Sequence, residues 1–444
     1  MQSVHRPAFT MGRYVIPLQL LLGFVIRMGL ISSQYREVIA DRVEISTLLN
    51  SWKRVTEGVS LYRFGISPYS GDIFHENPIA LYFCDFMINS IPGCIGVVFV
   101  LTDLMTALVL YLTAKDYMEE TERKQEMEMK TYAEGTEDLL LSDKDFKMSP
   151  VYVLAAYLFN PYSVLNCVGF TTTTFGNFCL ALTFYCMIKR LRLPCCFFLA
   201  LTVLQLFYPV VLLVPICIYI DGKKGKFSSV LTVVTFLSVL SLLLFVSYKI
   251  SGDWAFMHSV YIVMLTVSDL RPNIGLFWYF FTEMFEHFRL LFIYSFQLNA
   301  TLLYLAPLSF RFHSNPMLLA TSLTALITVF KSYPCLGDVG FYMSLLPMWK
   351  HLFNSKLVVP DLQQMFVILC SLIITSILGP TVWHLWIYSR SANANFYFGV
   401  TLAFATAQIF LITDILFAYI KRDFILRNKN VSDVHKDKLK LSLE

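Results

Sequence analysis

The chain has 444 residues, of which 56% are hydrophobic and 15% charged, with a formal net charge of +4. Ordinary globular domains carry about 25% charged residues, so this composition argues against a soluble fold. No basic patch interleaved with aromatic residues is present, so the sequence gives no reason to expect nucleic-acid binding. Many apolar runs reach the roughly 20 residues that span a bilayer, which predicts an all-α polytopic membrane protein with one multi-pass domain, 1–444.

The first apolar run, 14–33, predicts a retained signal-anchor helix, because no small-residue cleavage site follows it. Its Arg27 can either snorkel or face the helix bundle, and we favour the bundle. Residues 34–77 form a polar and aromatic loop with helical pieces. A half-helix is expected at 78–90, followed by a full span at 94–114.

Residues 115–148 are strongly charged with both signs, which indicates a solvated helix or a flexible loop. Tyr208–Pro209 must turn the chain, because basic clusters on both sides favour the same face of the membrane. The later spans are expected at about 149–166, 175–191, 194–208, 209–222, 227–249, 288–310, 315–332, 336–350, 357–379 and 397–420.

Short loops rich in Lys and Arg stay in the cytosol, and this rule orients the chain. It predicts roughly twelve spans with both termini cytosolic. The loop 34–77 is then luminal, whereas 115–148 is a cytosolic loop and 421–444 a cytosolic tail. Ten cysteines are scattered without CxxC pairs, so neither a disulfide framework nor a zinc site is predicted.

Three stretches at the luminal face, 269–288, 330–347 and 379–398, combine aromatic and ionisable residues. Charged groups at membrane depth usually face a bundle interior or a wet cavity, and broken helices are tolerated there. These stretches are therefore expected to line one polar chamber. The candidate lining residues are Asn273, Phe277, Trp278, Glu283, His287, Lys331, Asp338, Trp383, His384, Trp386, Tyr388, Ser391, Asn393, Asn395 and Tyr397.

Amides and tryptophans near the headgroup plane suit an amphiphile with a sugar-phosphate head. The alternative is an ordinary aromatic belt with polar loop ends. Glu283 and His287 are spaced to share one helical face, which favours a buried hydrogen-bonded pair. A zinc site on one helix needs two His residues and a third ligand, so no metal or other cofactor is predicted. No nucleophile motif or Gly-rich phosphate loop is present, so no catalytic residue is predicted.

Several motifs make the chain similar to the PIG-U family of GPI transamidase subunits. They are Ser51–Val55 with Glu57–Gly58, Ser67–Gly71, Pro272–Phe281, Glu283–Phe288, Phe330–Pro334 with Gly337–Val339, Trp383–Tyr388 and Ser391–Asn393. The resemblance covers most of the chain. It implies a multi-pass endoplasmic reticulum subunit of the complex that joins proteins to the ethanolamine phosphate of GPI. The implied partners are the caspase-like catalytic subunit PIG-K, together with PIG-T, PIG-S and a GAA-type subunit.

The PIG-U family also resembles the mannosyltransferases that use dolichol-phosphate mannose, which implies a GT-C-like architecture. Those enzymes carry Asp-x-Asp in the first luminal loop, where this chain reads Arg42–Val43–Glu44. Only one carboxylate of the pair remains, and Asp41 is displaced by one residue. This departure favours a cavity reused for binding over an active transferase.

The sequence thus predicts a non-catalytic subunit that binds the GPI glycolipid and possibly the hydrophobic signal of the precursor protein. The predicted headgroup-binding residues are Asn393, Asn395, Ser391, Asn273, His384 and Asp338, and for all six the alternative is capping or loop stabilisation. The rival functions are an active mannosyltransferase, which would need Glu44, and a transporter or lipid scramblase.

Overall fold

The computed structural model describes residues 12–222, 225–354 and 362–428, and within them every regular element is a helix. The helices are α1 (Gly12–Ile31), α2 (Tyr35–Ala40), α3 (Trp52–Arg63), α4 (Pro78–Ser90), α5 (Ile95–Glu128), α6 (Asp143–Leu158), α7 (Pro161–Val168), α8 (Thr173–Ile188), α9 (Arg192–Gln205), α10 (Leu213–Asp221), α11 (Lys226–Ser251), α12 (Ala255–Met257), α13 (Val263–Thr266), α14 (Phe277–Glu283), α15 (Glu286–Leu298), α16 (Leu305–Arg311), α17 (Pro316–Phe330), α18 (Leu336–Leu345), α19 (His351–Asn354), α20 (Leu362–Ile387) and α21 (Ala394–Arg427).

Six helical stretches are long and apolar enough to cross a membrane, namely α1, α5, α11, α15–α16, α20 and α21. The pair α6–α7, bent by 46°, makes a seventh if it is counted as one span, and α8, α9, α10 and α17 belong to shorter apolar helices. The chain is thus an all-α polytopic membrane protein, as the composition predicts. The count of twelve spans and the GT-C-like arrangement stay predictions.

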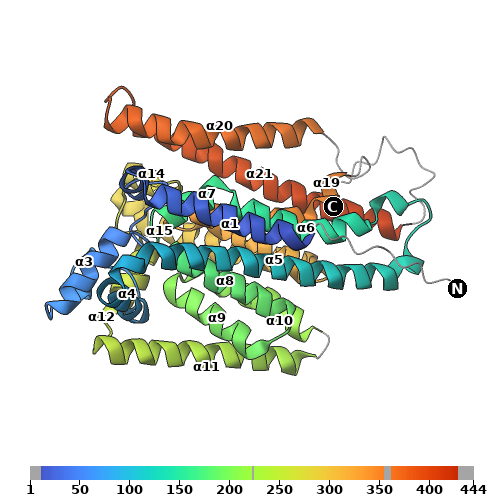
Figure 1. Cartoon of the computed structure of the whole chain (residues 1–444), viewed down its shortest axis with the longest axis horizontal. Coiled ribbons are helices and arrows are strands. Elements are labelled where there is room, and N and C mark those ends of the chain that lie inside the picture. The colour runs from blue at the N-terminus through green and yellow to red at the C-terminus, as the bar shows by residue number, and fades with distance from the viewer. Residues whose placement is uncertain (1–11, 223–224, 355–361, 429–444) are drawn as a thin grey trace.

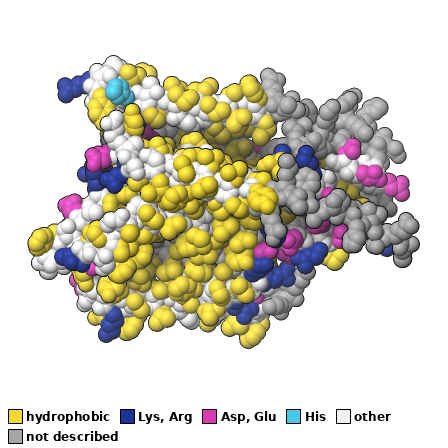
Figure 2. All heavy atoms as spheres, viewed as in Figure 1, with side chains coloured by type: hydrophobic (Ala, Val, Ile, Leu, Met, Phe, Trp, Pro, Cys, Tyr) yellow, Lys and Arg dark blue, Asp and Glu magenta, His cyan; other side chains and the backbone are white. Residues whose placement is uncertain are grey.

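Most long helices run roughly along the long axis of the molecule, and α3, α4, α12 and α14 gather at one end (Figure 1, left). We call this the loop end; besides these helices, the connecting segments within 32–77, 252–276, 331–335 and 388–393 lie there. In the same view, hydrophobic side chains cover the middle of the surface, and charged side chains lie mainly toward the two ends (Figure 2). This banding is what a bilayer requires of the surface that it surrounds.

Asparagine and proline define where several helices begin. Asn77, Asn160 and Asn315 each precede a proline at the first helical position, and each side chain accepts a hydrogen bond from a backbone N–H of that helix. Asparagine is a preferred N-cap, and proline costs no hydrogen bond at the first position. The expected half-helix at 78–90 is confirmed as α4.

The charged segment 115–148 differs from a simple loop. Residues 115–128 continue α5, so the helical alternative holds for them. Beyond them the chain packs against the end of α21, where the Ala133 amide donates to the Leu426 carbonyl at 2.9 Å and Arg422 donates to the Leu139 carbonyl at 2.9 Å. The described part of the predicted tail, 421–428, is likewise the end of α21 rather than a free segment.

Arg27 of α1 faces the bundle, as predicted, and is fully buried. Its Nε donates to Asp103 Oδ2 of α5 at 2.6 Å, and Tyr157 of α6 donates its hydroxyl to Asp103 Oδ1 at 2.7 Å. Arg27 Nη1 also donates to the Leu158 carbonyl at 2.9 Å. A buried charge is tolerated only with such partners, so this group fixes the packing of α1, α5 and α6.

Removing one partner of this pair should therefore destabilise the bundle. The variant Asp103→Ala leaves Arg27 buried without its counter-ion, at a cost of about 3–5 kcal/mol. We expect a clearly lower thermal midpoint and less monodisperse protein in detergent, measured by fluorescence-detected size-exclusion chromatography. The double variant Arg27→Met/Asp103→Ala removes the unpaired charge and should recover most of the loss. A double variant as unstable as the single one would assign the cost to the Tyr157 contact or to the lost volume instead.

Candidate functional site

The segment 42–50 covers the loop end of the bundle and is held there by backbone hydrogen bonds. The Leu336 amide of α18 donates to the Glu44 carbonyl at 2.9 Å, and the Thr172 amide donates to the Asn50 carbonyl at 3.0 Å. Asn50 Nδ2 also donates to Thr173 Oγ1 at 2.9 Å. The first loop is thus tied to the starts of α8 and α18, and polar side chains lie buried beneath it.

Lys331 and Asp338 form an ion pair in this buried region. Lys331 Nζ lies 2.6 Å from Asp338 Oδ2, with the side chains 5% and 10% exposed. The Cys335 amide donates to the same carboxylate at 2.9 Å, so Asp338 closes the turn between α17 and α18. A buried pair of this kind needs both charges and the extra hydrogen bond. Asp338, predicted to contact a headgroup, is therefore already neutralised by Lys331.

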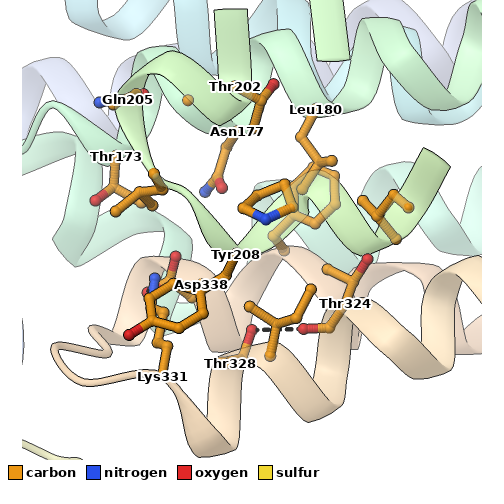
Figure 3. A pocket seen from close by; sticks show the side chains of 16 residues that line it. Thr173, Asn177, Leu180, Thr202, Gln205, Tyr208, Thr324, Thr328, Lys331 and Asp338 are labelled. Carbon is orange, nitrogen blue, oxygen red and sulfur yellow. Dashed lines mark hydrogen bonds and ion pairs between the residues drawn. The ribbon is translucent and has the colours of Figure 1, made fainter. Parts of the chain in front are cut away.

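A small cavity lies beside this pair, with Thr173 and Asn177 of α8 on one wall and Lys331 with Asp338 on the other (Figure 3). Its volume is about 40 Å³. One water needs about 10–15 Å³ of such volume, so the cavity has room for a few waters and not for a sugar or phosphate. The chamber predicted behind the loop end is filled mainly by side chains at this depth.

The hydroxyls of residues 171–174 are all engaged in hydrogen bonds. Thr171 donates to Asn166 Oδ1 at 2.5 Å, and Thr174 accepts from Asn166 Nδ2 at 3.2 Å. Thr173 accepts from Asn50, and Thr172 donates to the Glu76 carboxylate. Thr172 and Thr173 thus hold the first loop on α8, and Thr171 and Thr174 tie α8 to Asn166 of α7, so all four hydroxyls have structural roles.

Glu76 is a buried carboxylate that the sequence reasoning missed. It lies two residues before the start of α4 and is 3% exposed. Its carboxylate accepts a hydrogen bond from the Thr172 hydroxyl. Burial raises the pKa of Glu76 to about 7, although the hydrogen bonds from Thr172 and Gln205 oppose this effect. The only signal in the sequence was an acid directly before the Asn-Pro start of a helix, which does not distinguish a buried acid from a solvated one.

Glu44, the remaining carboxylate of the Arg42–Val43–Glu44 segment, is 4% exposed and paired with Arg42. Arg42 donates from Nε and Nη2 to the two carboxylate oxygens at 3.2 Å each. Tyr397 of α21 adds a longer hydrogen bond from its hydroxyl, at 3.4 Å. A carboxylate held by a guanidinium in this bidentate manner is a poor general base and a poor metal ligand.

An aromatic cluster joins α14 to the hairpin of α20 and α21. Trp278 stacks on Trp386 with ring centroids 6.3 Å apart, and Tyr279 stacks on Phe398 at 4.3 Å. Tyr397 lies against Trp278 at 6.1 Å and against Trp383 of α20 at 5.2 Å. We call these six residues, Trp278, Tyr279, Trp383, Trp386, Tyr397 and Phe398, the aromatic cluster.

Exposed polar side chains border the aromatic cluster. Asn395 accepts a hydrogen bond from Tyr279 at 2.8 Å, whereas Asn393 accepts the Phe396 amide at 3.3 Å and caps α21. Ser391 donates to the Leu385 carbonyl at 3.4 Å. His384 stacks on Tyr388 with centroids 5.2 Å apart, and both are exposed. The side-chain Nδ2 atoms of Asn393 and Asn395 donate to no residue in the described part of the chain. Both can therefore donate hydrogen bonds to a partner outside the chain.

The structure therefore divides the predicted headgroup residues between two places. Asn393, Asn395, Ser391 and His384 lie at the aromatic cluster. Asp338 and Asn273 lie away from this cluster, and Asp338 is in the buried ion pair. Asn273 is 3% exposed; its side chain accepts the Gly275 amide at 2.7 Å and donates to the Arg271 carbonyl at 3.3 Å. Phe277 is also buried, packed against Phe281 and Phe296.

The predicted buried pair of Glu283 and His287 is wrong. The helix is interrupted between them, because α14 ends at Glu283, Met284 is extended and α15 begins at Glu286. Helical spacing therefore does not apply, and both side chains are exposed. Within the described residues, no three His, Cys, Asp or Glu side chains gather as a metal-ligand set.

Comparisons with known proteins identify the family. The model of the family "GPI transamidase subunit PIG-U" matches residues 21–404. The chain belongs to the PIG-U family. It is 37% identical over 423 residues to the "GPI-anchor transamidase component PIGU" of Cricetulus griseus, covering 93% of this chain and 95% of the relative. The Homo sapiens protein of the same name is 37% identical over 421 residues, covering 92% and 94%. The "GPI transamidase component GAB1" of Saccharomyces cerevisiae is 28% identical over 392 residues, covering 88% and 90%.

The buried Glu76 should make the stability of this PIG-U family member pH-dependent. Its ordinary pKa is 4.5 and its folded pKa is about 7, so the folded state holds the proton more tightly than the unfolded state. Protonated Glu76 therefore adds up to about 3 kcal/mol to the free energy of unfolding. This contribution is fully present below pH 4.5 and is lost as the pH rises through 7.

The variant Glu76→Gln keeps the acceptor for Thr172 and removes the charge. We expect its thermal midpoint in detergent to exceed that of the natural chain at pH 8, with a smaller difference at pH 5. The exposed Glu57→Gln on α3 is the control and should leave the pH profile unchanged. Equal profiles for Glu76→Gln and the natural chain would mean that Glu76 is ionised in the folded state throughout this range.

Proposed function

We propose that this chain is the subunit of the GPI transamidase that binds the GPI glycolipid and presents its headgroup for attachment to proteins. The names of the relatives, as transamidase components, support a role in that complex. The chain is then an accessory subunit of the endoplasmic reticulum membrane, with both termini in the cytosol and the loop end in the lumen. Its partners are the caspase-like PIG-K, PIG-T, PIG-S and a GAA-type subunit.

The observation that carries this proposal is the aromatic cluster with its border of exposed amides. Tryptophan and tyrosine rings prefer the headgroup level of a bilayer, and exposed amides hydrogen-bond sugar hydroxyls without a charge to desolvate. Asn393, Asn395 and Ser391 lie together at the turn between two long apolar helices. Acyl chains beside those helices would place a glycan against these three side chains.

The alternative of an active mannosyltransferase is weakened by the state of Glu44. An Asp-x-Asp pair needs free carboxylates to bind a metal or to act as a base. Here the single carboxylate is buried and shared between Arg42 and Tyr397. Catalysis in this proposal resides in the caspase-like partner.

The decisive test of the proposal is a mild-detergent pull-down of the tagged chain with mass spectrometry of proteins and lipids. We expect the caspase-like subunit and GPI to be recovered together with the chain. Recovery of the chain without the other subunits, combined with turnover of dolichol-phosphate mannose that Glu44→Gln abolishes, would replace the proposal with the transferase.

Asn393 allows a sharper test, because its capping and recognition roles can be separated. Asn393→Ser keeps a good N-cap for α21 but removes the amide, whereas Asn393→Lys places a positive charge at the headgroup position. If the amide binds the headgroup, both variants lower surface GPI-anchored protein at normal expression, with Asn393→Lys lowering it several-fold. The readout is flow cytometry of cells whose own gene for this subunit is deleted.

The control is Asn89→Lys, an exposed asparagine of α4 outside the aromatic cluster, which should leave anchoring unchanged. Normal anchoring with Asn393→Ser would reduce Asn393 to a helix cap.

A further inference from the structure

A second and larger cavity lies at the loop end, outside the aromatic cluster. Its volume is about 190 Å³, enough for a group of several heavy atoms rather than a single water. The first loop, α3 and the segment before α14 form its walls. The lining residues are Ala40, Asp41, Val43, Ser46, Thr47, Leu48, Ser51, Arg54, Arg271, Pro272, Asn273 and Tyr333.

Two guanidinium groups at this cavity share one carboxylate. Asp269 Oδ2 lies 3.8 Å from Arg54 Nη2 and 3.4 Å from Arg271 Nε. The acid in the lining itself, Asp41, is paired with Lys53 at 2.5 Å. The three cations of this group, Lys53, Arg54 and Arg271, outnumber the two carboxylates, Asp41 and Asp269, which leaves one positive charge in excess. Glu57, one turn further along α3, is exposed and outside the lining.

The two arginines are held differently. Arg54 is anchored from Nη1 to the carbonyls of Asp72 and Ile73, at 3.4 Å and 3.1 Å. Its Nη2 is beyond hydrogen-bond range of Asp269. Burial and repulsion by Arg271 lower the pKa of Arg54, and Asp269, Glu57 and Tyr333 only partly offset them. Arg271 is 76% exposed at its side chain, and Asn273 holds its carbonyl. Both guanidinium groups therefore keep N–H donors that no described residue uses.

We propose that this cavity binds a phosphate group of a lipid headgroup, with Arg54 and Arg271 as its charged donors. Guanidinium groups match phosphate oxygens in geometry and charge, and a partly enclosed site strengthens the contact. The chemistry alone fits the phosphodiester of a glycolipid or that of an ordinary phospholipid. The choice of GPI as the source rests on the proposed function.

The first experiment measures binding of O-phosphorylethanolamine and of inorganic phosphate to the purified full-length chain in detergent, by isothermal titration. We expect saturable binding that Arg271→Gln weakens at least tenfold. Because this side chain is exposed, its replacement leaves the packing of the fold unchanged. Asp269→Asn removes the competing carboxylate but keeps the acceptor for the Arg271 amide. It should tighten phosphate binding several-fold, a gain that misfolding cannot produce.

Arg63→Gln is the matched control. Arg63 is an exposed arginine at the end of α3, paired with Asp85 and outside the cavity, so its loss removes the same charge elsewhere. Its affinity should equal that of the natural chain. An equal loss in Arg63→Gln and Arg271→Gln, or affinity unaffected by Arg271→Gln and Asp269→Asn, would overturn the proposed site.

The second experiment distinguishes the sources by mass spectrometry of the lipids that copurify with the natural chain and with Arg271→Gln. Loss of GPI with unchanged phospholipid supports the assignment to GPI. Loss of phospholipid with unchanged GPI overturns that assignment in favour of an ordinary phospholipid, and an unchanged lipid profile overturns the lipid site. If the proposed function fails because no transamidase subunit is recovered, the titration still reports on the cavity, so the two failures can be told apart.

Discussion

Burial of charge inside an apolar bundle is the constraint on which the rest of this structure depends. Each buried ion needs a counter-ion and further hydrogen bonds, because the desolvation cost is several kcal/mol per group. Arg27 with Asp103 meets this condition between α1, α5 and α6, and Lys331 with Asp338 meets it between α17 and α18. Helices that could slide in a purely apolar bundle are thereby locked in register, which fixes the loops at one end.

The same constraint separates the structural polar residues from those that remain available. Glu44 and Asp338 have partners within the chain, so they hold the first loop and the turn at 331–335 in place. Asn393, Asn395 and the arginines at positions 54 and 271 retain donors that the described structure does not use.

Sequence patterns predicted the parts of the fold that depend on composition and on prolines that interrupt helices. The apolar runs, the half-helix at 78–90 and the inward orientation of Arg27 follow from hydropathy, proline and the cost of exposing charge to lipid. The break after α9 lies at Leu206, before the predicted Tyr208–Pro209. The Glu283–His287 pair failed because spacing assumes an unbroken helix, and nothing in that aromatic run marks the extended Met284. Asn273 was misread because an amide that caps its own turn looks the same in sequence as one that awaits a ligand. The arginine cavity could not be predicted, since α3 and residues 271–273 meet only in three dimensions.

The hairpin of α20 and α21 is held at two distant points. At the loop end, Tyr279 donates to Asn395; at the opposite end, the segment after α5 is bonded to Leu426 and Arg422. Helix α21 has 34 residues, a rod of roughly 50 Å that exceeds the hydrocarbon thickness of about 30 Å. The helix therefore connects the loop end directly to the charged segment after α5. Because hydrogen bonds tie both of its ends, a displacement of its first turn would be transmitted along one continuous rod to that segment.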